Sequence, residues 1–160
     1  MRVRQIHYGH PWPLNLSWQE DPVRPELSRE FRHTAGREVW TNEGAIICVA
    51  YCKMVPTTVD QLTSLVGLDH AIFYTVWSRR PGAGRTLVND IWSYLLLTRP
   101  WIKRYVTLSP KTKMAYNFHI KNGAIVLSQN ETTDNYEYKE KERIKDGFPA
   151  LRRTDGGPDF

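Results

Sequence analysis

The chain of 160 residues has the length of a single domain with its own hydrophobic core. Hydrophobic residues make up 41% of it and charged residues 24%, which excludes general disorder. The formal net charge of +5 favours an anionic partner: a phosphorylated cofactor, nucleic acid or an acidic protein surface. No apolar run reaches the length of a membrane span, and residues 1–4 lack the apolar core of a signal peptide, so we expect a cytoplasmic protein.

The first 37 residues predict an irregular arm followed by a short helix. Residues 1–8 alternate loosely between polar and apolar side chains and could form a first strand. Residues 10–25 hold four prolines and two tryptophans, a composition that disfavours regular structure. We expect the tryptophans to anchor this arm on the domain; the alternative is that they grip a protein partner. A short helix is expected over residues 25–33.

A hairpin is predicted by strand-like residues 38–41, a turn at residues 42–44 and a longer strand over residues 45–54. The second strand is apolar on both faces, so we expect it in the centre of a sheet that is covered on both sides. It carries both cysteines, Cys48 and Cys52, which we expect as reduced core thiols rather than as a disulfide or zinc ligands.

The strongest functional signal is an arginine-rich glycine turn over residues 79–85. A β-rich apolar run, residues 71–77, leads into the turn, and residues 86–98 follow it with apolar side chains at helical spacing. Glycine lets the backbone approach a ligand, and the start of a helix presents free N–H groups to it. A strand, a glycine turn and a helix in this order are therefore typical of a phosphate-binding cradle.

The remaining elements are a strand, a helix and a hairpin. Residues 104–108 are expected as the strand, and Ser109 as the cap of a helix that has Pro110 in its first turn. Residues 124–128 and 132–138 are expected to pair as the hairpin. Strands that alternate with helices predict a layered α/β domain.

We expect this single domain to span residues 1–138, with the arm and the short helix in residues 1–37. Residues 139–160 are charged at their start and rich in glycine and proline at their end. They should form a flexible tail unless a protein partner orders them.

Two motifs in the same chain resemble those of the GNAT acetyltransferase superfamily. The family's cofactor loop reads Arg/Gln-x-x-Gly-x-Gly/Ala, and the matching residues are Arg79, Gly82 and Gly84. A later helix of the family reads Ala-x-x-Phe-Tyr-x-x-x-Gly-Phe, and this chain has at the same spacing Ala115, Phe118, His119, Gly123 and Ala124. The resemblance covers roughly residues 38–138. It implies an α/β fold with a mixed, mostly antiparallel central sheet, a splay between two strands and helices on both faces.

The resemblance also implies acetyl-CoA as the cofactor. The pyrophosphate would bind to the backbone amides and positive charges of the glycine turn, at Arg79, Arg80, Gly82, Ala83, Gly84 and Arg85. The preceding strand would pair with the pantetheine arm through Tyr74 and Val76. Thr112 stands where family members often have an asparagine that binds this arm. Pro81 departs from the pattern, because it removes one N–H donor from the loop.

The catalytic groups also depart from the family's pattern. His119 replaces the usual tyrosine acid; as an imidazolium it could protonate the leaving thiolate, or it could simply pack in the helix. Tyr116 is the second candidate acid. No carboxylate lies within residues 71–77, where the family often has its base, and the remaining candidates, Asp69, His70 and Glu43, are expected to be ordinary surface residues.

The resemblance implies an N-acetyltransferase that moves an acetyl group from acetyl-CoA to a primary amine. The alternative is a GNAT-shaped protein with weakened or lost catalysis that binds partners through its N-terminal arm and charged tail. A tailed-phage virion or assembly component is one form of this alternative. Nucleic-acid binding would rest on charge alone, and we rank it last because the cofactor loop already explains the arginines of the glycine turn.

Overall fold

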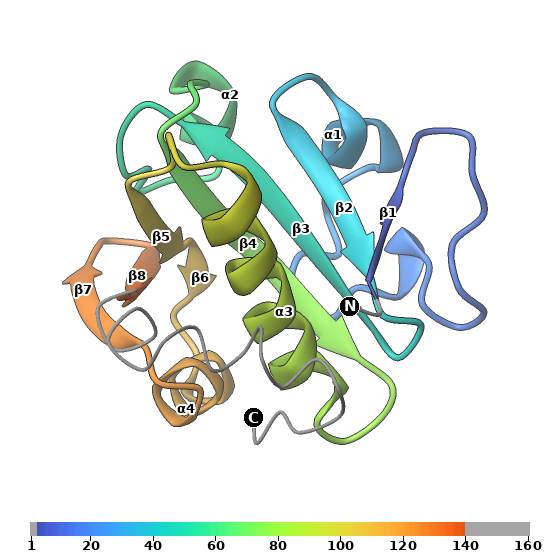
Figure 1. Cartoon of the computed structure of the whole chain (residues 1–160). Helices are drawn as coiled ribbons and strands as arrows, with labels where there is room; N and C mark the ends of the chain where they lie inside the picture. Colours follow the sequence, from blue (N-terminus) through green and yellow to red (C-terminus); the bar gives the residue numbers. More distant parts are fainter. Residues whose placement is uncertain (1–2, 140–160) are drawn as a thin grey trace.

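The computed structural model describes residues 3–139, which form one sheet with helices on both faces (Figure 1). The strands are β1 Arg4–Ile6, β2 Arg37–Thr41, β3 Ala45–Cys52, β4 His70–Ser78, β5 Arg104–Thr107, β6 Ser109–Pro110, β7 Ile125–Gln129 and β8 Thr133–Tyr138. Their order is β1-β2-β3-β4-β5-β8-β6, and β7 pairs with β8. The helices are α1 Arg29–His33, α2 Gln61–Ser64, α3 Ala83–Thr98 and α4 Lys113–Lys121. All strand pairs are antiparallel except β4 with β5, so the predicted mixed α/β fold is confirmed.

Each face of the sheet packs against its own hydrophobic core. α3 covers one face with apolar side chains three or four residues apart, such as Leu87 and Ile91, and these pack with Ile47 of β3. The other face is covered by α1, α2 and the arm, and its core includes Ile46 and Leu62. Every residue of β3 is buried, which confirms the prediction of a central strand covered on both sides.

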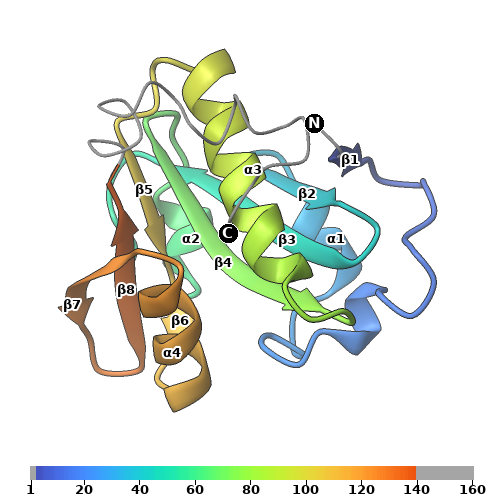
Figure 2. The same cartoon turned by 60° about the horizontal axis from the view of Figure 1, so that its bottom comes forward.

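The sheet opens between β4 and β5. These two strands are paired in parallel only from His70 to Phe73 on β4, and the last bond across the gap runs from the N–H of Leu108 to the carbonyl of Phe73. A β-bulge sits at the same level, because Cys48 of β3 lies opposite Thr75 while the next β3 residue lies opposite Phe73. Beyond this point β4 continues beside β3, whereas the chain after β5 turns into β6 and α4 (Figure 2). The predicted splay is therefore present.

Two predicted helix starts need correction. Ser109 and Pro110 were expected to open a helix, but they form the short strand β6, which pairs with β8. The Ser109 hydroxyl lies 2.8 Å from that of Thr107, and Thr112 caps α4 instead, since its Oγ1 accepts a hydrogen bond from the N–H of Ala115. The helix after the glycine turn starts at Ala83, three residues before the predicted start.

The arm, residues 7–28, is irregular apart from a 3₁₀ turn at Trp18–Glu20, as its composition predicted. It crosses the face of the sheet opposite α3. Trp12 stacks on Trp77 of β4 with ring centroids 6.3 Å apart, and Leu16 is buried in the same core. The expectation that a tryptophan anchors the arm on the domain is thus confirmed for Trp12. The predicted tail lies outside the described residues, except Lys139.

A buried ion pair holds the end of the arm. Asp21 Oδ2 lies 2.8 Å from Arg32 Nη1, and both side chains are fully buried. The same carboxylate accepts hydrogen bonds from Thr75 Oγ1 in β4 and from the N–H groups of Val23 and Arg24. The arm is therefore tied to the part of β4 that has left β5. Within residues 3–139, no helix is long and apolar enough to cross a membrane.

Asp21→Asn should lower the free energy of unfolding by about 3–5 kcal/mol, because Arg32 would remain as a buried charge without its counter-ion. Urea denaturation measures this loss. Glu26→Gln, which removes an exposed carboxylate from the same arm, is the control and should change stability by less than about 0.5 kcal/mol. A loss of less than about 1 kcal/mol in Asp21→Asn would contradict the role of this pair as the anchor.

Candidate functional site

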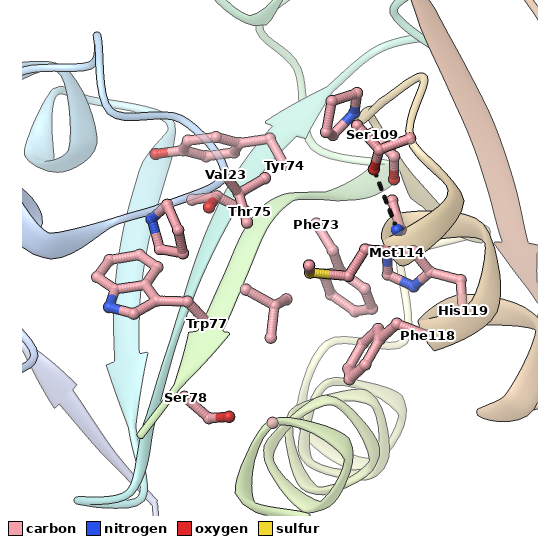
Figure 3. Close-up of a pocket in the computed structure, with 16 residues that line it drawn as sticks. Val23, Phe73, Tyr74, Thr75, Trp77, Ser78, Ser109, Met114, Phe118 and His119 are labelled. Carbon is pink, nitrogen blue, oxygen red and sulfur yellow. Dashed lines mark hydrogen bonds between the residues drawn. The ribbon is translucent and has the colours of Figure 1, made fainter. Parts of the chain in front are cut away.

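A cavity of about 440 Å³ occupies the opening between β4 and the β6–α4 segment (Figure 3). Its walls come from the arm, the free half of β4, the start of α3, and the β6–α4 segment. The lining residues are Pro22, Val23, Phe73, Tyr74, Thr75, Val76, Trp77, Ser78, Gly84, Ser109, Pro110, Thr112, Met114, Ala115, Phe118 and His119. This lining includes no carboxylate, lysine or arginine, so the cavity suits an uncharged, elongated group.

The free half of β4 adds backbone polarity to this apolar wall. From Thr75 to Ser78 the strand pairs with β3 on one side, and within residues 3–139 no strand pairs with it on the other. Backbone N–H and C=O groups need partners when they are buried. The edge can therefore receive a ligand that carries amide groups, as an added strand would.

The glycine turn forms the start of α3. The N–H of Ala83 bonds to the carbonyl of Arg80 at 3.1 Å, with Pro81 and Gly82 between them. Gly82 has φ +81°, which completes a type II turn: proline fits its second position and glycine its third. The hairpin turn between β2 and β3 supports this loop, because Asn42 Nδ2 donates to the carbonyl of Ala83. The proline and the glycine explain the conformation of the turn, and the contact with Asn42 ties it to the hairpin.

The turn leaves several donors available. In the described part of the chain, the N–H groups of Gly82, Gly84 and Arg85 have no hydrogen-bond acceptor. The N–H of Ala83, which was predicted to bind the pyrophosphate, is used within the turn itself. Gly84 lines the cavity, so the start of the helix and the cavity belong to one site. The helix dipole favours negative charge at this position.

The three predicted arginines of the turn, Arg79, Arg80 and Arg85, are all exposed. The guanidinium of Arg80 lies directly over Gly44 in the β2–β3 turn, where a side chain on residue 44 would collide with it. Arg80 therefore packs on the turn between β2 and β3.

The predicted contacts with the pantetheine arm differ in kind. Val76 lines the cavity with its side chain. The side chain of Tyr74 is 1% exposed and packs in the opposite core, so only its backbone can serve the cavity. Thr112 lines the cavity as well, although its hydroxyl is engaged in capping α4.

His119 lines the cavity from α4, where its ring points toward the side of Phe73 together with Phe118 (Figure 3). Burial lowers the pKa of the ring to about 3, so the imidazole is neutral at pH 7. The neutral ring lacks the proton that the predicted imidazolium acid would donate. Its Nδ1 lies 2.8 Å from the hydroxyl of Tyr138, and its ring stacks on Tyr136.

The other candidate acid and bases lie outside the cavity lining. Tyr116 is 46% exposed and packs edge-on against Tyr136. Glu43 pairs with Arg4 in the β2–β3 turn. Asp69 bonds to the adjacent His70 at the start of β4, at the end of the strand that is still paired with β5.

The arm contributes residues that the sequence did not single out. Pro22 and Val23 form a wall of the cavity. Arg24 is 7% exposed and bridges the splay, with Nη2 2.8 Å from the carbonyl of Leu108 and Nε 3.4 Å from that of Tyr74. The only local signal is Asp21 before a proline, a pattern typical of turns. Nothing in the sequence indicated that this turn would lie in the splay.

Solved structures with the same fold cover most of the chain at low identity. Malonyl-CoA decarboxylase from Cupriavidus metallidurans matches with a TM-score of 0.61 and 16% identity, covering 97% of this chain and 64% of that protein. The chain thus spans less than two thirds of that protein's length. The GNAT domain of S. lividans PAT matches with a TM-score of 0.55 and 12% identity over 85% of this chain and 88% of that domain.

A Bacillus acetyltransferase, from B. subtilis and solved in complex with CoA, matches with a TM-score of 0.56 and 9% identity over 85% of this chain and 95% of that one. No family model matches the chain, and no curated protein matches it in sequence. The likeness therefore lies in the fold. On these grounds the chain has a GNAT-like fold.

Proposed function

We propose that the protein is an acetyl-CoA-dependent N-acetyltransferase. The observation that carries the proposal is the continuity of the site. The free amides at the start of α3 open into an apolar cavity, which runs along the unpaired edge of β4 and ends at the arm. An acyl-CoA has the matching order of groups: a pyrophosphate, a chain with two amides, and a thioester.

The residues of the chain fit such a ligand. The N–H groups of Gly82, Gly84 and Arg85 would bind the pyrophosphate, with the charges of Arg79 and Arg85 beside them. The edge of β4 near Val76 would pair with the amides of the pantetheine arm. Pro81 lacks an N–H and so removes one donor from the loop. It also restricts the backbone of the turn that presents the following amides, which lowers the entropy cost of holding them in place.

The acceptor would be an amine that enters the cavity neutral. No carboxylate lines the cavity to hold an ammonium, and the buried carboxylate just outside the lining, Asp21, is already paired with Arg32. The amine nitrogen would bond to the acetyl carbonyl carbon as the carbon–sulfur bond breaks, and its proton would end on the thiol of CoA. We therefore propose a monoamine with an apolar substituent as the substrate class.

Two alternatives make different demands on the same site. A GNAT-shaped binding component, such as a virion or assembly protein, needs neither an acceptor path nor turnover. Malonyl-CoA is the second acyl-CoA to compare, because a malonyl-CoA decarboxylase is among the matched structures. Both alternatives are outcomes of the two experiments below.

Acetyl-CoA should raise the melting temperature, because a ligand that binds only the folded state stabilises it by about 2.7 kcal/mol at 100 times its Kd. Gly84→Glu should abolish this shift. Its side chain would enter the cavity between Phe118 and Val76 and would place a negative charge where phosphate binds. Differential scanning fluorimetry measures the melting temperature of the wild-type protein and of Gly84→Glu, each with and without acetyl-CoA.

Leu97→Glu is the control for this experiment, because it adds the same charge at an exposed position near the other end of α3. It should keep the full shift. The cofactor proposal fails if wild-type protein shows no shift at saturating acetyl-CoA. If only malonyl-CoA raises the melting temperature, malonyl-CoA and not acetyl-CoA is the ligand.

Phenethylamine should be acetylated with a kcat/KM at least about tenfold above that of spermidine, since burying an unpaired charge costs more than burying apolar surface. Release of the CoA thiol measures the rate. Val23→Asp, which adds a carboxylate to the wall of the cavity, should move the preference toward spermidine. A wild-type preference for spermidine contradicts the substrate class, and binding of acetyl-CoA without acetylation of any amine favours the binding component.

A further inference from the structure

A chain of hydrogen bonds between side chains leads from the start of α3 to His119. Asn89 Nδ2 lies 2.9 Å from the carbonyl of Arg85 and 2.8 Å from Asn122 Oδ1. Asn122 Nδ2 lies 3.3 Å from Tyr138 Oη, which in turn lies 2.8 Å from His119 Nδ1. The chain ties three elements together, since these residues belong to α3, the end of α4, and β8. Asn89, Asn122, Tyr138 and His119 are all buried.

From Asn89 as far as Tyr138, the direction of each hydrogen bond follows from the carbonyl of Arg85. The carbonyl of Arg85 can only accept, so Asn89 presents its amide nitrogen and donates to both Arg85 and Asn122. Asn122 therefore accepts through Oδ1 and donates through Nδ2 to the hydroxyl of Tyr138. Tyr138 thus receives one hydrogen, and its own hydroxyl hydrogen is in reach of His119 Nδ1.

The ring of His119 is also fixed by packing. It stacks on Tyr136 with centroids 5.3 Å apart and an angle of 26°, and Phe118 meets it edge-on at 5.0 Å. The two nitrogens of an imidazole point in nearly opposite directions. Because Nδ1 is turned toward Tyr138 and His119 lines the cavity, the other edge of the ring, which carries Nε2, is the one available to the cavity.

We propose that Tyr138 and Asn122 are positioning residues that hold His119 in the tautomer with hydrogen on Nε2, so that this neutral N–H donates to the acyl carbonyl oxygen of a bound thioester. The first part of this proposal concerns the protein alone, and only the carbonyl contact rests on the proposed acetyltransferase function. In a neutral imidazole one nitrogen donates and the other accepts. An accepting Nδ1 leaves Nε2 as the donor.

An N–H donor at this place would stabilise the negative charge that forms during acyl transfer. When an amine attacks the thioester, negative charge grows on the carbonyl oxygen, and a fixed N–H in an apolar cavity stabilises this charge better than water does. The low pKa of His119 keeps the ring neutral across the physiological range, so it acts without a change of protonation. His119 would thus stabilise the transition state in place of protonating the thiolate.

The tautomer can be read in the ligand-free protein. Long-range ¹H–¹⁵N NMR of histidine side chains separates a protonated ring nitrogen from an unprotonated one, and His119→Gln identifies the signals of residue 119. We expect Nε2 protonated and Nδ1 unprotonated between pH 5 and pH 8. A protonated Nδ1, or an imidazolium that titrates near pH 6.5, would overturn the proposal.

Tyr138→Phe removes the hydroxyl and keeps the ring, so the single tautomer should give way to a mixture. Asn122→Ala provides a second test that leaves the tyrosine in place, and it should weaken the same preference. Tyr51→Phe is the matched control: it removes a buried hydroxyl that bonds to Glu38 outside the cavity lining, and it should leave the signals of His119 unchanged. An unchanged single tautomer in both Tyr138→Phe and Asn122→Ala would refute the positioning role.

The kinetic test separates this role from a structural one. In Tyr138→Phe, kcat should fall about tenfold while the KM for acetyl-CoA stays within about twofold, because the hydrogen bond matters in the transition state and not in binding. Tyr51→Phe should retain both values. Wild-type kcat in Tyr138→Phe would overturn the catalytic part of the proposal. An inactive wild-type protein with the expected tautomer would remove the acetyltransferase function and leave the positioning role standing.

Discussion

The structure depends on the point where β4 and β5 separate. A strand that loses its neighbour in the middle of a sheet exposes backbone groups that must find other partners. Here the bond from Leu108 to Phe73 ends the pairing, and a bulge at the same level redirects β4. Arg24 satisfies the carbonyls of Tyr74 and Leu108 in the opening. What remains of the free edge lines the cavity, so the constraint on the backbone is also the origin of the site.

The arm forms one wall of the cavity in this opening. Asp21 bonds to Thr75 of β4 while it pairs with Arg32, so a fully buried ion pair fixes the wall formed by Pro22 and Val23. Buried pairs add little net stability compared with apolar packing, but they are costly to break. The pair therefore serves to fix one position of the arm. As a result the cavity is apolar along its walls, while buried charge lies just outside its lining.

Local patterns predicted the fold well, and contacts between distant residues limited the prediction of the site. The strand β3, the turn at Pro81 and Gly82, and the helix after it follow from neighbouring residues, which is why their sequence signals were readable. His119 could be identified as a cavity residue by its motif, yet its neutral state could not. That state depends on burial and on Tyr138, which arrives from the last strand. The roles of Arg24 and the arm likewise depend on contacts across fifty or more positions of the chain.

The central claim is that the start of α3 and the free edge of β4 form one binding site for an acyl-CoA. Titration of ¹⁵N-labelled protein with CoA, followed by backbone amide NMR, tests whether they do. We expect the largest shifts at Gly82, Gly84 and Arg85, and further shifts along β4 to Val76. Shifts confined to the arm, or no shifts at saturating CoA, would contradict it.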